Sequence, residues 1–133
     1  MDKFELNHAV ALFSQQTTTI NNLWTVYVVA TFAAAGYGTS ASPLPATVAL
    51  AVTCGFLAFA VGHWSLLYQG LTINRQLQRD ISAFMESATS PFKLSIKELV
   101  ATANPPWISL TIHLLIDLCV VVALWWRVKW PIS

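Results

Sequence analysis

Two ionisable side chains lie four positions apart in one of the most apolar runs of the chain. His113 and Asp117 stand in the segment TIHLLIDLC, residues 111–119. Residues four apart lie on the same face of an α-helix, so these two side chains can form a hydrogen bond. An imidazole beside a carboxylate can relay protons, and an imidazole can also ligate haem iron. The surrounding elements decide which of these chemistries is open to the pair.

The composition indicates a membrane protein. Of 133 residues, 56% are hydrophobic and only 10% are charged, and the mean hydropathy is +0.59. Soluble domains carry about 25% charged residues, so the excess apolar surface is expected to face a lipid bilayer. The net charge is +1 and no basic stripe is present, which excludes nucleic acid as a partner.

Three segments are apolar and long enough to be transmembrane helices, which need about 20 residues. They lie at about residues 21–39, 44–68 and 106–128. Lipid offers no hydrogen-bond partner for an open backbone, so all three are expected to be α-helices. The short GTSASPLP turn between the first two predicts an antiparallel hairpin.

The segment 69–104 is the only substantial polar stretch, and its apolar residues recur at helical spacing. Only Gly70 interrupts the pattern, so the second span is expected to continue as one helix to about residue 88. The first helix is expected to begin well outside the membrane, because no Gly or Pro precedes Gly36. These two projections are predicted to pack into a helical hairpin rather than to lie in the headgroup layer.

The predicted packing faces are three apolar stripes, the last on a shorter amphipathic helix before the third span. The stripes are Leu6, Ala9, Val10, Phe13, Thr17 and Ile20; Ile73, Leu77, Ile81, Phe84, Met85 and Ala88; and Phe92, Ile96, Leu99, Val100 and Ala103. The prediction is therefore an all-α integral membrane protein with three transmembrane helices, forming a single domain over residues 1–133.

Positive charges predict the orientation in the cell membrane. Lysines and arginines favour the cytoplasmic side of a span. The N-terminus and the polar segment carry five of them, and the residues after the third span carry two. The five are Lys3, Arg75, Arg79, Lys93 and Lys97, and the two are Arg127 and Lys129. A multi-pass protein is expected, with the N-terminus and segment 69–104 cytoplasmic and the C-terminus outside.

Depth along the spans predicts one intramembrane polar site. At about 1.5 Å of rise per residue, His113 lies roughly 10 Å in from the inner end of the third span. His63 lies at about the same depth in the second span, and Tyr27 in the first lies slightly nearer that surface. Asp117 stands one turn deeper than His113. Tyr27, His63, His113 and Asp117 are therefore the candidate site residues.

Three interpretations of this site stay open. In the first, the ionisable groups satisfy each other or pair with Thr25, Thr31 and Ser109, as polar contacts between membrane helices do. In the second, His63 and His113 hold haem b, or the site binds a quinone. In the third, His113 and Asp117 stand in a proton or ion path, which requires several copies of a three-span chain.

The second interpretation also has a similarity of architecture behind it. A chain of this length with three spans and a histidine in the second resembles the membrane-anchor subunits of succinate and fumarate dehydrogenases. One such family carries a His-Arg-x-Ser/Thr-Gly run, which is absent here because His63 is followed by Trp64 and Ser65. The resemblance implies a haem- or quinone-binding anchor and is limited to the format of the chain.

Small residues and thiols of the spans favour packing roles. Ala51, Gly55, Ala58 and Gly62 form overlapping small-xxx-small pairs, which suit close helix contact. Two cysteines, Cys54 and Cys119, lie in apolar runs and are expected to be buried, reduced thiols. Neither spacing nor setting predicts a metal site.

Catalytic motifs are absent from the sequence. It contains no Gly-rich phosphate loop, no HExxH, no serine elbow and no CxxC. The leading expectation is a non-enzymatic membrane component, which assembles as a homo-oligomer or as an accessory subunit of a larger complex. The haem- or quinone-binding anchor and the oligomeric proton or ion channel are the alternatives.

Overall fold

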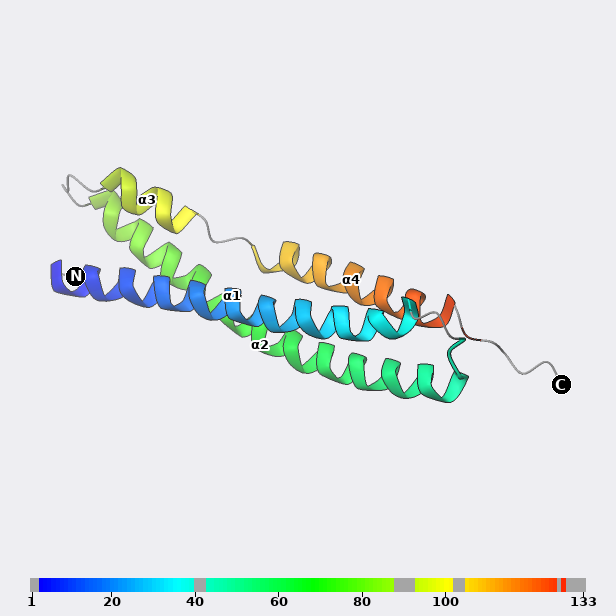
Figure 1. Cartoon of the computed structure of the whole chain (residues 1–133). Coiled ribbons are helices and arrows are strands. Elements are labelled where there is room, and N and C mark those ends of the chain that lie inside the picture. The colour runs from blue at the N-terminus through cyan, green and yellow to red at the C-terminus, as the bar shows by residue number, and fades with distance from the viewer. Residues whose placement is uncertain (1–2, 40–42, 88–92, 102–104, 127, 129–133) are drawn as a thin grey trace.

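The computed structural model describes residues 3–39, 43–87, 93–101, 105–126 and 128, and these form a helical bundle (Figure 1). The four helices are α1 (Lys3–Thr39), α2 (Ala46–Ser87), α3 (Lys93–Ala101) and α4 (Pro106–Trp126). The described residues contain no strand, and one isolated bridge pairs Leu44 with Val128. The prediction of an all-α protein is therefore confirmed.

The first two helices are long, continuous and antiparallel. At about 1.5 Å per residue, α1 with 37 residues and α2 with 42 both exceed 50 Å, against a hydrocarbon core of about 30 Å. Pro45 stands just before α2, and its carbonyl accepts hydrogen bonds from Val48 N and Ala49 N at 3.0 Å. Gly70 does not interrupt α2, and its carbonyl accepts a 3.3 Å hydrogen bond from Gln16 Nε2 on α1.

The bundle has two distinct ends, named here the α3 end and the Trp126 end. At the α3 end lie the start of α1, the end of α2 and α3, which packs on α2 (Figure 1). At the Trp126 end, α4 packs against both α1 and α2. The short helix α3 and the long helix α4 thus cover different lengths of the same hairpin.

The core repeats every seven residues. In α1 the buried positions are Leu6, Phe13, Ile20, Tyr27 and Ala34, all at most 8% exposed. Such a heptad period keeps one seam of each helix against its neighbours, as in left-handed coiled coils. The same seam in α2 includes His63, so the repeat places ionisable residues where apolar ones usually stand.

Three apolar clusters occupy this seam. The cluster at the Trp126 end consists of Ala34, Leu44, Ala49, Phe56, Val120, Leu124 and Val128. The middle cluster consists of Ile20, Leu67 and Leu71. The cluster at the α3 end consists of Leu6, Phe13, Ile81, Met85 and Val100. This last cluster confirms that the start of α1 and the end of α2 pack against each other.

The prediction of a packing face is wrong for two members of the apolar stripes. Ile73 is 48% exposed and Leu99 is 46% exposed, because the helical seam passes to one side of them. Three other members, Ala88, Phe92 and Ala103, lie outside the described residues.

The small residues of α2 do not pack against other described parts of the chain. Ala51, Gly55, Ala58 and Gly62 all lie on an exposed face, and a Cβ added at either glycine would meet no atom within 4 Å. A packing role inside the bundle is therefore wrong for this stripe. The close contact between helices is made instead at Gly38, where an added Cβ would lie 2.6 Å from the Ala123 carbonyl oxygen. Only glycine allows the α1 and α4 backbones to approach this closely.

The two cysteines are also placed differently from the expectation. Cys54 and Cys119 are free thiols on the exposed surface. An apolar run does not distinguish a residue that faces the core from one that faces lipid, because both surroundings favour the same side chains. That ambiguity is the physical reason for the error.

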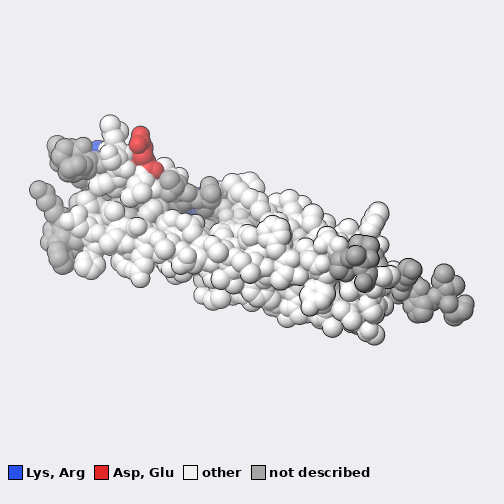
Figure 2. Space-filling view, in the orientation of Figure 1, with Lys and Arg blue, Asp and Glu red and all other residues white. Residues whose placement is uncertain are grey.

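Charged residues and long apolar stretches are distributed unevenly along the length of the molecule. Two stretches, Ala46–Glu86 and Lys93–Trp126, contain windows long and apolar enough to cross a membrane by length and composition. In the face drawn in Figure 2, the charged side chains of the described residues gather toward the α3 end, and the other described residues visible there are neither Lys, Arg, Asp nor Glu. The expected span in α1 is not among these stretches. Its two asparagines, Asn21 and Asn22, dilute the apolar run that follows them.

Candidate functional site

The four candidate residues meet at one level of the bundle. Tyr27 comes from α1, His63 from α2, and His113 and Asp117 from α4. Their exposed fractions are 0% for Tyr27 and His113, 4% for His63 and 9% for Asp117. The three-helix seam therefore contains a buried polar layer. A function of this layer beyond packing stays a prediction.

A continuous set of hydrogen bonds joins the four side chains, named here the polar network. His63 Nε2 lies 2.8 Å from the Leu23 carbonyl oxygen, and His63 Nδ1 lies 3.1 Å from His113 Nε2. His113 Nδ1 lies 3.0 Å from Asp117 Oδ2. The Tyr27 hydroxyl lies 2.8 Å from Asp117 Oδ1 and 3.1 Å from the His113 carbonyl oxygen, so its one proton has two acceptors within reach.

Aromatic rings enclose the network. Tyr27 stacks on His113 with ring centroids 3.9 Å apart, and the two histidine rings stack at 5.3 Å. Trp24 and Trp64 approach His113 at 6.1 and 6.0 Å. Burial behind these rings leaves the polar atoms to satisfy one another, since an unpaired polar group in an apolar setting is costly.

The Leu23 carbonyl sets the order of protons along the network. A carbonyl only accepts, so His63 Nε2 carries a hydrogen. One proton then lies between the two histidines and one between His113 and Asp117. With one proton in each of these contacts, the network as a whole has no net charge, whichever of the two atoms in a contact holds the proton. An uncharged, fully bonded arrangement suits a low-dielectric interior.

This arrangement does not fit bis-histidine ligation of haem. Both ring nitrogens of His63 and both of His113 already have protein partners, so none is available to an iron atom. Among the described residues, no group of three His, Cys, Asp or Glu side chains is placed to hold a metal ion. The two histidines bind each other where the haem hypothesis places a cofactor between them.

The described residues of one chain do not form a continuous path for protons either. Beyond Asp117, the described seam continues as the apolar cluster of the Trp126 end, which includes Phe56 and Val120. The next polar contact inside the bundle is a 3.1 Å hydrogen bond from Trp125 Nε1 to Thr53 Oγ1. The network therefore ends against an apolar region instead of continuing toward the Trp126 end.

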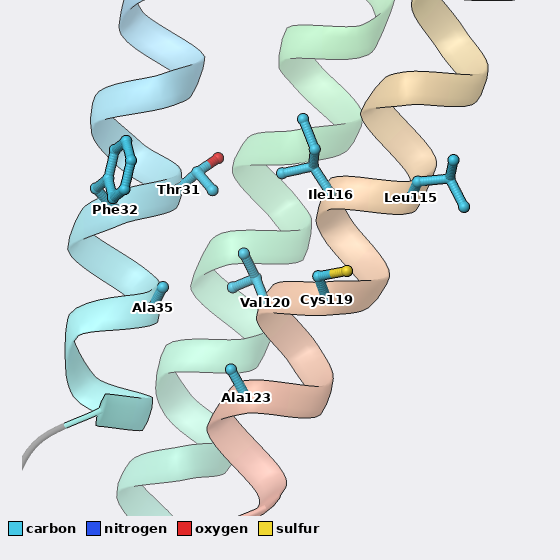
Figure 3. A pocket seen from close by; sticks show the side chains of 8 residues that line it. All are labelled: Thr31, Phe32, Ala35, Leu115, Ile116, Cys119, Val120 and Ala123. Atoms are coloured by element: carbon cyan, nitrogen blue, oxygen red, sulfur yellow. The ribbon is translucent and has the colours of Figure 1, made fainter.

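An apolar groove of about 370 Å³ lies between α1 and α4, on the Trp126 side of the network (Figure 3). Thr31 contributes its hydroxyl to this lining, and Thr31 Oγ1 is buried without a hydrogen-bond partner. The lining residues are Thr31, Phe32, Ala35, Leu115, Ile116, Cys119, Val120 and Ala123. The groove could accept an apolar molecule with one polar group.

Two features of the site were not visible as motifs. The Leu23 carbonyl belongs to the backbone and becomes an acceptor only because α2 passes beside it. Trp24 and Trp64 contact the His113 ring, and neither was among the candidate site residues. The seven-residue repeat of α1 is the sequence signal that would have predicted a buried Tyr27.

Comparison of the chain with protein-family models, with curated proteins and with solved structures finds no match in any of the three.

Proposed function

We propose that this chain is a small non-enzymatic integral membrane protein whose three spans lie in α1, α2 and α4. It works as an assembling membrane component, either with copies of itself or as an accessory subunit of a larger complex. The observation that carries the proposal is the inverted polarity of the bundle. Large apolar side chains are exposed around it while ionisable side chains are buried within it.

The exposed apolar side chains come from all three proposed spans. Phe32 on α1 is 74% exposed, Val61 on α2 is 72% exposed, and Leu118 on α4 is 61% exposed. A soluble monomer does not present such continuous apolar surface. In a bilayer the same surface meets acyl chains, and buried polar groups supply contacts between helices.

Threonine hydroxyls on the outer surface support the same proposal. Thr25 donates to the Asn21 carbonyl at 3.0 Å, and Thr111 donates to the Trp107 carbonyl at 2.8 Å. Each hydroxyl is thus satisfied by its own helix and needs no water. The excess of lysine and arginine near the α3 end supports a cytoplasmic position for that end.

Assembly is supported by the outward stripe on α2. Ala51, Gly55, Ala58 and Gly62 present a smooth face that no other part of the described chain covers. A substitution of Gly55 by Leu is expected to lower the mass of the detergent-solubilised particle, measured by light scattering. The monomer fold should be unaffected, because the position has open space. An unchanged mass would remove this face from the assembly.

The native cysteines test the membrane assignment. Cys54 and Cys119 are exposed on the bundle, yet in open membrane fragments they are expected to resist a charged, water-soluble thiol reagent. Both should react once SDS unfolds the protein. Ser95, exposed on α3, supplies the control, because Ser95→Cys is expected to react in the native membrane. Native labelling of Cys54 as fast as that of the control would show that water covers this surface and would overturn the proposal.

Quinone binding is a second candidate, favoured by the unpartnered hydroxyl of Thr31 in the groove of Figure 3. That hydroxyl can donate to a quinone carbonyl while the apolar lining holds the tail. Titration of the purified protein with a short-chain quinone, followed by tryptophan fluorescence, is expected to saturate and to weaken in Thr31→Val. Binding of equal strength in this near-isosteric variant would place the quinone elsewhere.

A further inference from the structure

The buried face of α4 changes character along its length. Toward Pro106 the buried residues are Ser109, His113 and Asp117, and toward Trp126 they are Val120 and Leu124. The middle apolar cluster contains residues of α1 and α2 only. The half of α4 nearer Pro106 is therefore held to α1 and α2 chiefly by the polar network and its aromatic neighbours.

The contact between His63 Nδ1 and His113 Nε2 is a hydrogen bond only when it holds one proton. With one proton in each contact, every donor faces an acceptor. A further proton on the histidine pair turns His63 Nδ1 and His113 Nε2 into two N–H donors facing each other across 3.1 Å. It also leaves a net positive charge in an apolar interior, which is costly until water reaches the site.

We propose that the polar network is a proton-operated latch between α2 and α4. Uptake of one proton from water breaks the His63–His113 contact and releases the half of α4 nearer Pro106. The step adds one proton and one positive charge to the network and breaks no covalent bond. Loss of the proton restores a donor facing an acceptor, and the latch closes.

The other half of α4 is anchored independently of protons. Val120 and Leu124 belong to the apolar cluster of the Trp126 end, and the backbones of Gly38 and Ala123 are in close contact. These contacts contain no titratable group. Movement is therefore confined to the half that the network holds, and α4 swings about its anchored half.

Among the described residues, the ionisable groups that face the histidine pair are members of the network. From α1 this is Tyr27, from α2 His63 itself, and from α4 His113 and Asp117. The Asp117 carboxylate is the one acidic group among them. Its Oδ2 already shares a proton with His113 Nδ1, so a further proton on the pair comes to the two nitrogens that face each other, and the added positive charge opens the latch.

Ser109 reports on the latch because it lies one turn before His113 and is 7% exposed. The full-length chain would carry Ser109→Cys, with alanine at the two native cysteine positions, in detergent micelles. Labelling by a small neutral disulfide reagent is measured and divided by the rate for the SDS-unfolded protein at the same pH. This ratio is expected to rise about tenfold from about pH 8 to about pH 5, the range in which histidine titrates.

Two matched variants distinguish the latch from general loosening. Val120→Cys, in the anchored half, should show a ratio that does not change with pH. His63→Gln keeps a donor for Leu23 and an acceptor for His113 but removes the second imidazole, so the pH response of Ser109→Cys should disappear. A flat ratio at Ser109→Cys, an equal rise at Val120→Cys, or an undiminished rise in His63→Gln would each overturn the latch.

Hydrogen exchange on the unmodified chain provides a second readout that needs no cysteine variant. After correction for intrinsic exchange rates, amides of residues 109–113 are expected to lose protection at low pH while those of 120–124 keep it. Equal protection of both segments at low pH would contradict the proposal. The latch proposal rests on the polar network and not on the membrane assignment. The thiol accessibility test in membranes can therefore overturn the membrane assignment without affecting the latch, and the test in micelles can overturn the latch alone.

Discussion

The two halves of α4 have similar outer surfaces and opposite inner ones. Leu115 and Leu118 are 58% and 61% exposed on one side of the division and Val122 is 51% exposed on the other. Inside, one half presents His113 and Asp117 and the other presents Leu124. In the membrane setting proposed above, apolar burial between helices gains little, because acyl chains are as apolar as leucine. Directional hydrogen bonds therefore hold the first half, and close packing holds the second.

The largest expected effect comes from breaking the network at its acid. Asp117→Leu leaves His113 Nδ1 without its partner and the Tyr27 hydroxyl with the His113 carbonyl alone, and loss of one member of a buried pair costs about 3–5 kcal/mol. Asp117→Asn keeps an acceptor for the tyrosine and a donor for the histidine, so it should cost far less. Unfolding by SDS in mixed micelles measures both variants. Equal losses would show that the hydrogen bonds do not hold this half.

The packed half should respond to the loss of volume instead. Leu124 is fully buried, and Leu124→Ala is expected to lower the free energy of unfolding by about 2–4 kcal/mol through the cavity that it leaves. Leu118→Ala, on the outer face of the same helix, should leave it unchanged. The same SDS titration applies. A comparable loss in both variants would mean that the outer face is also packed, as in an oligomer.

The close contact between the α1 and α4 backbones at Gly38 gives a smaller expected effect on stability, and Gly36 supplies the control. Gly38→Ala would place a Cβ 2.6 Å from the Ala123 carbonyl, and the overpacking is expected to cost about 1–3 kcal/mol. Gly36→Ala meets nothing within 4 Å and should be slightly stabilising, because alanine is the better helix former. Thermal unfolding followed by circular dichroism compares them. The unfolding temperatures of the two variants are expected to shift in opposite directions. Two equal shifts would contradict the close contact of the α1 and α4 backbones at Gly38.

The smallest expected effect is that of the tyrosine hydroxyl. Tyr27→Phe keeps the ring stacked on His113 but removes one donor to Asp117, which is worth about 1 kcal/mol. The Asp117 carboxylate retains its contact with His113. Introducing Tyr27→Phe into the Asp117→Leu background, in which the acceptor is absent, should show coupling between the two sites. Strict additivity in this double-mutant cycle would mean that they do not share a hydrogen bond.

Periodicity was sufficient to predict the continuous helices and the packing of Phe13 with Ile81 at the α3 end. Polarity then identified His63 and His113, because ionisable residues stand out in an apolar run. The inner and outer faces of the spans could not be separated this way. Cys54 was expected inside and lies outside, since lipid and protein core select the same residues.

The sequence by itself determined the helical class, the lengths of the helices and the depth at which polar groups occur. Helical rise converts residue number into depth, so residues on different helices can be matched without a structure. Only the tertiary structure decided that His63 and His113 bond to each other, and that the Leu23 carbonyl orders their protons. Rotation of each helix about its axis decides these contacts, and that rotation depends on the packing of all three helices together.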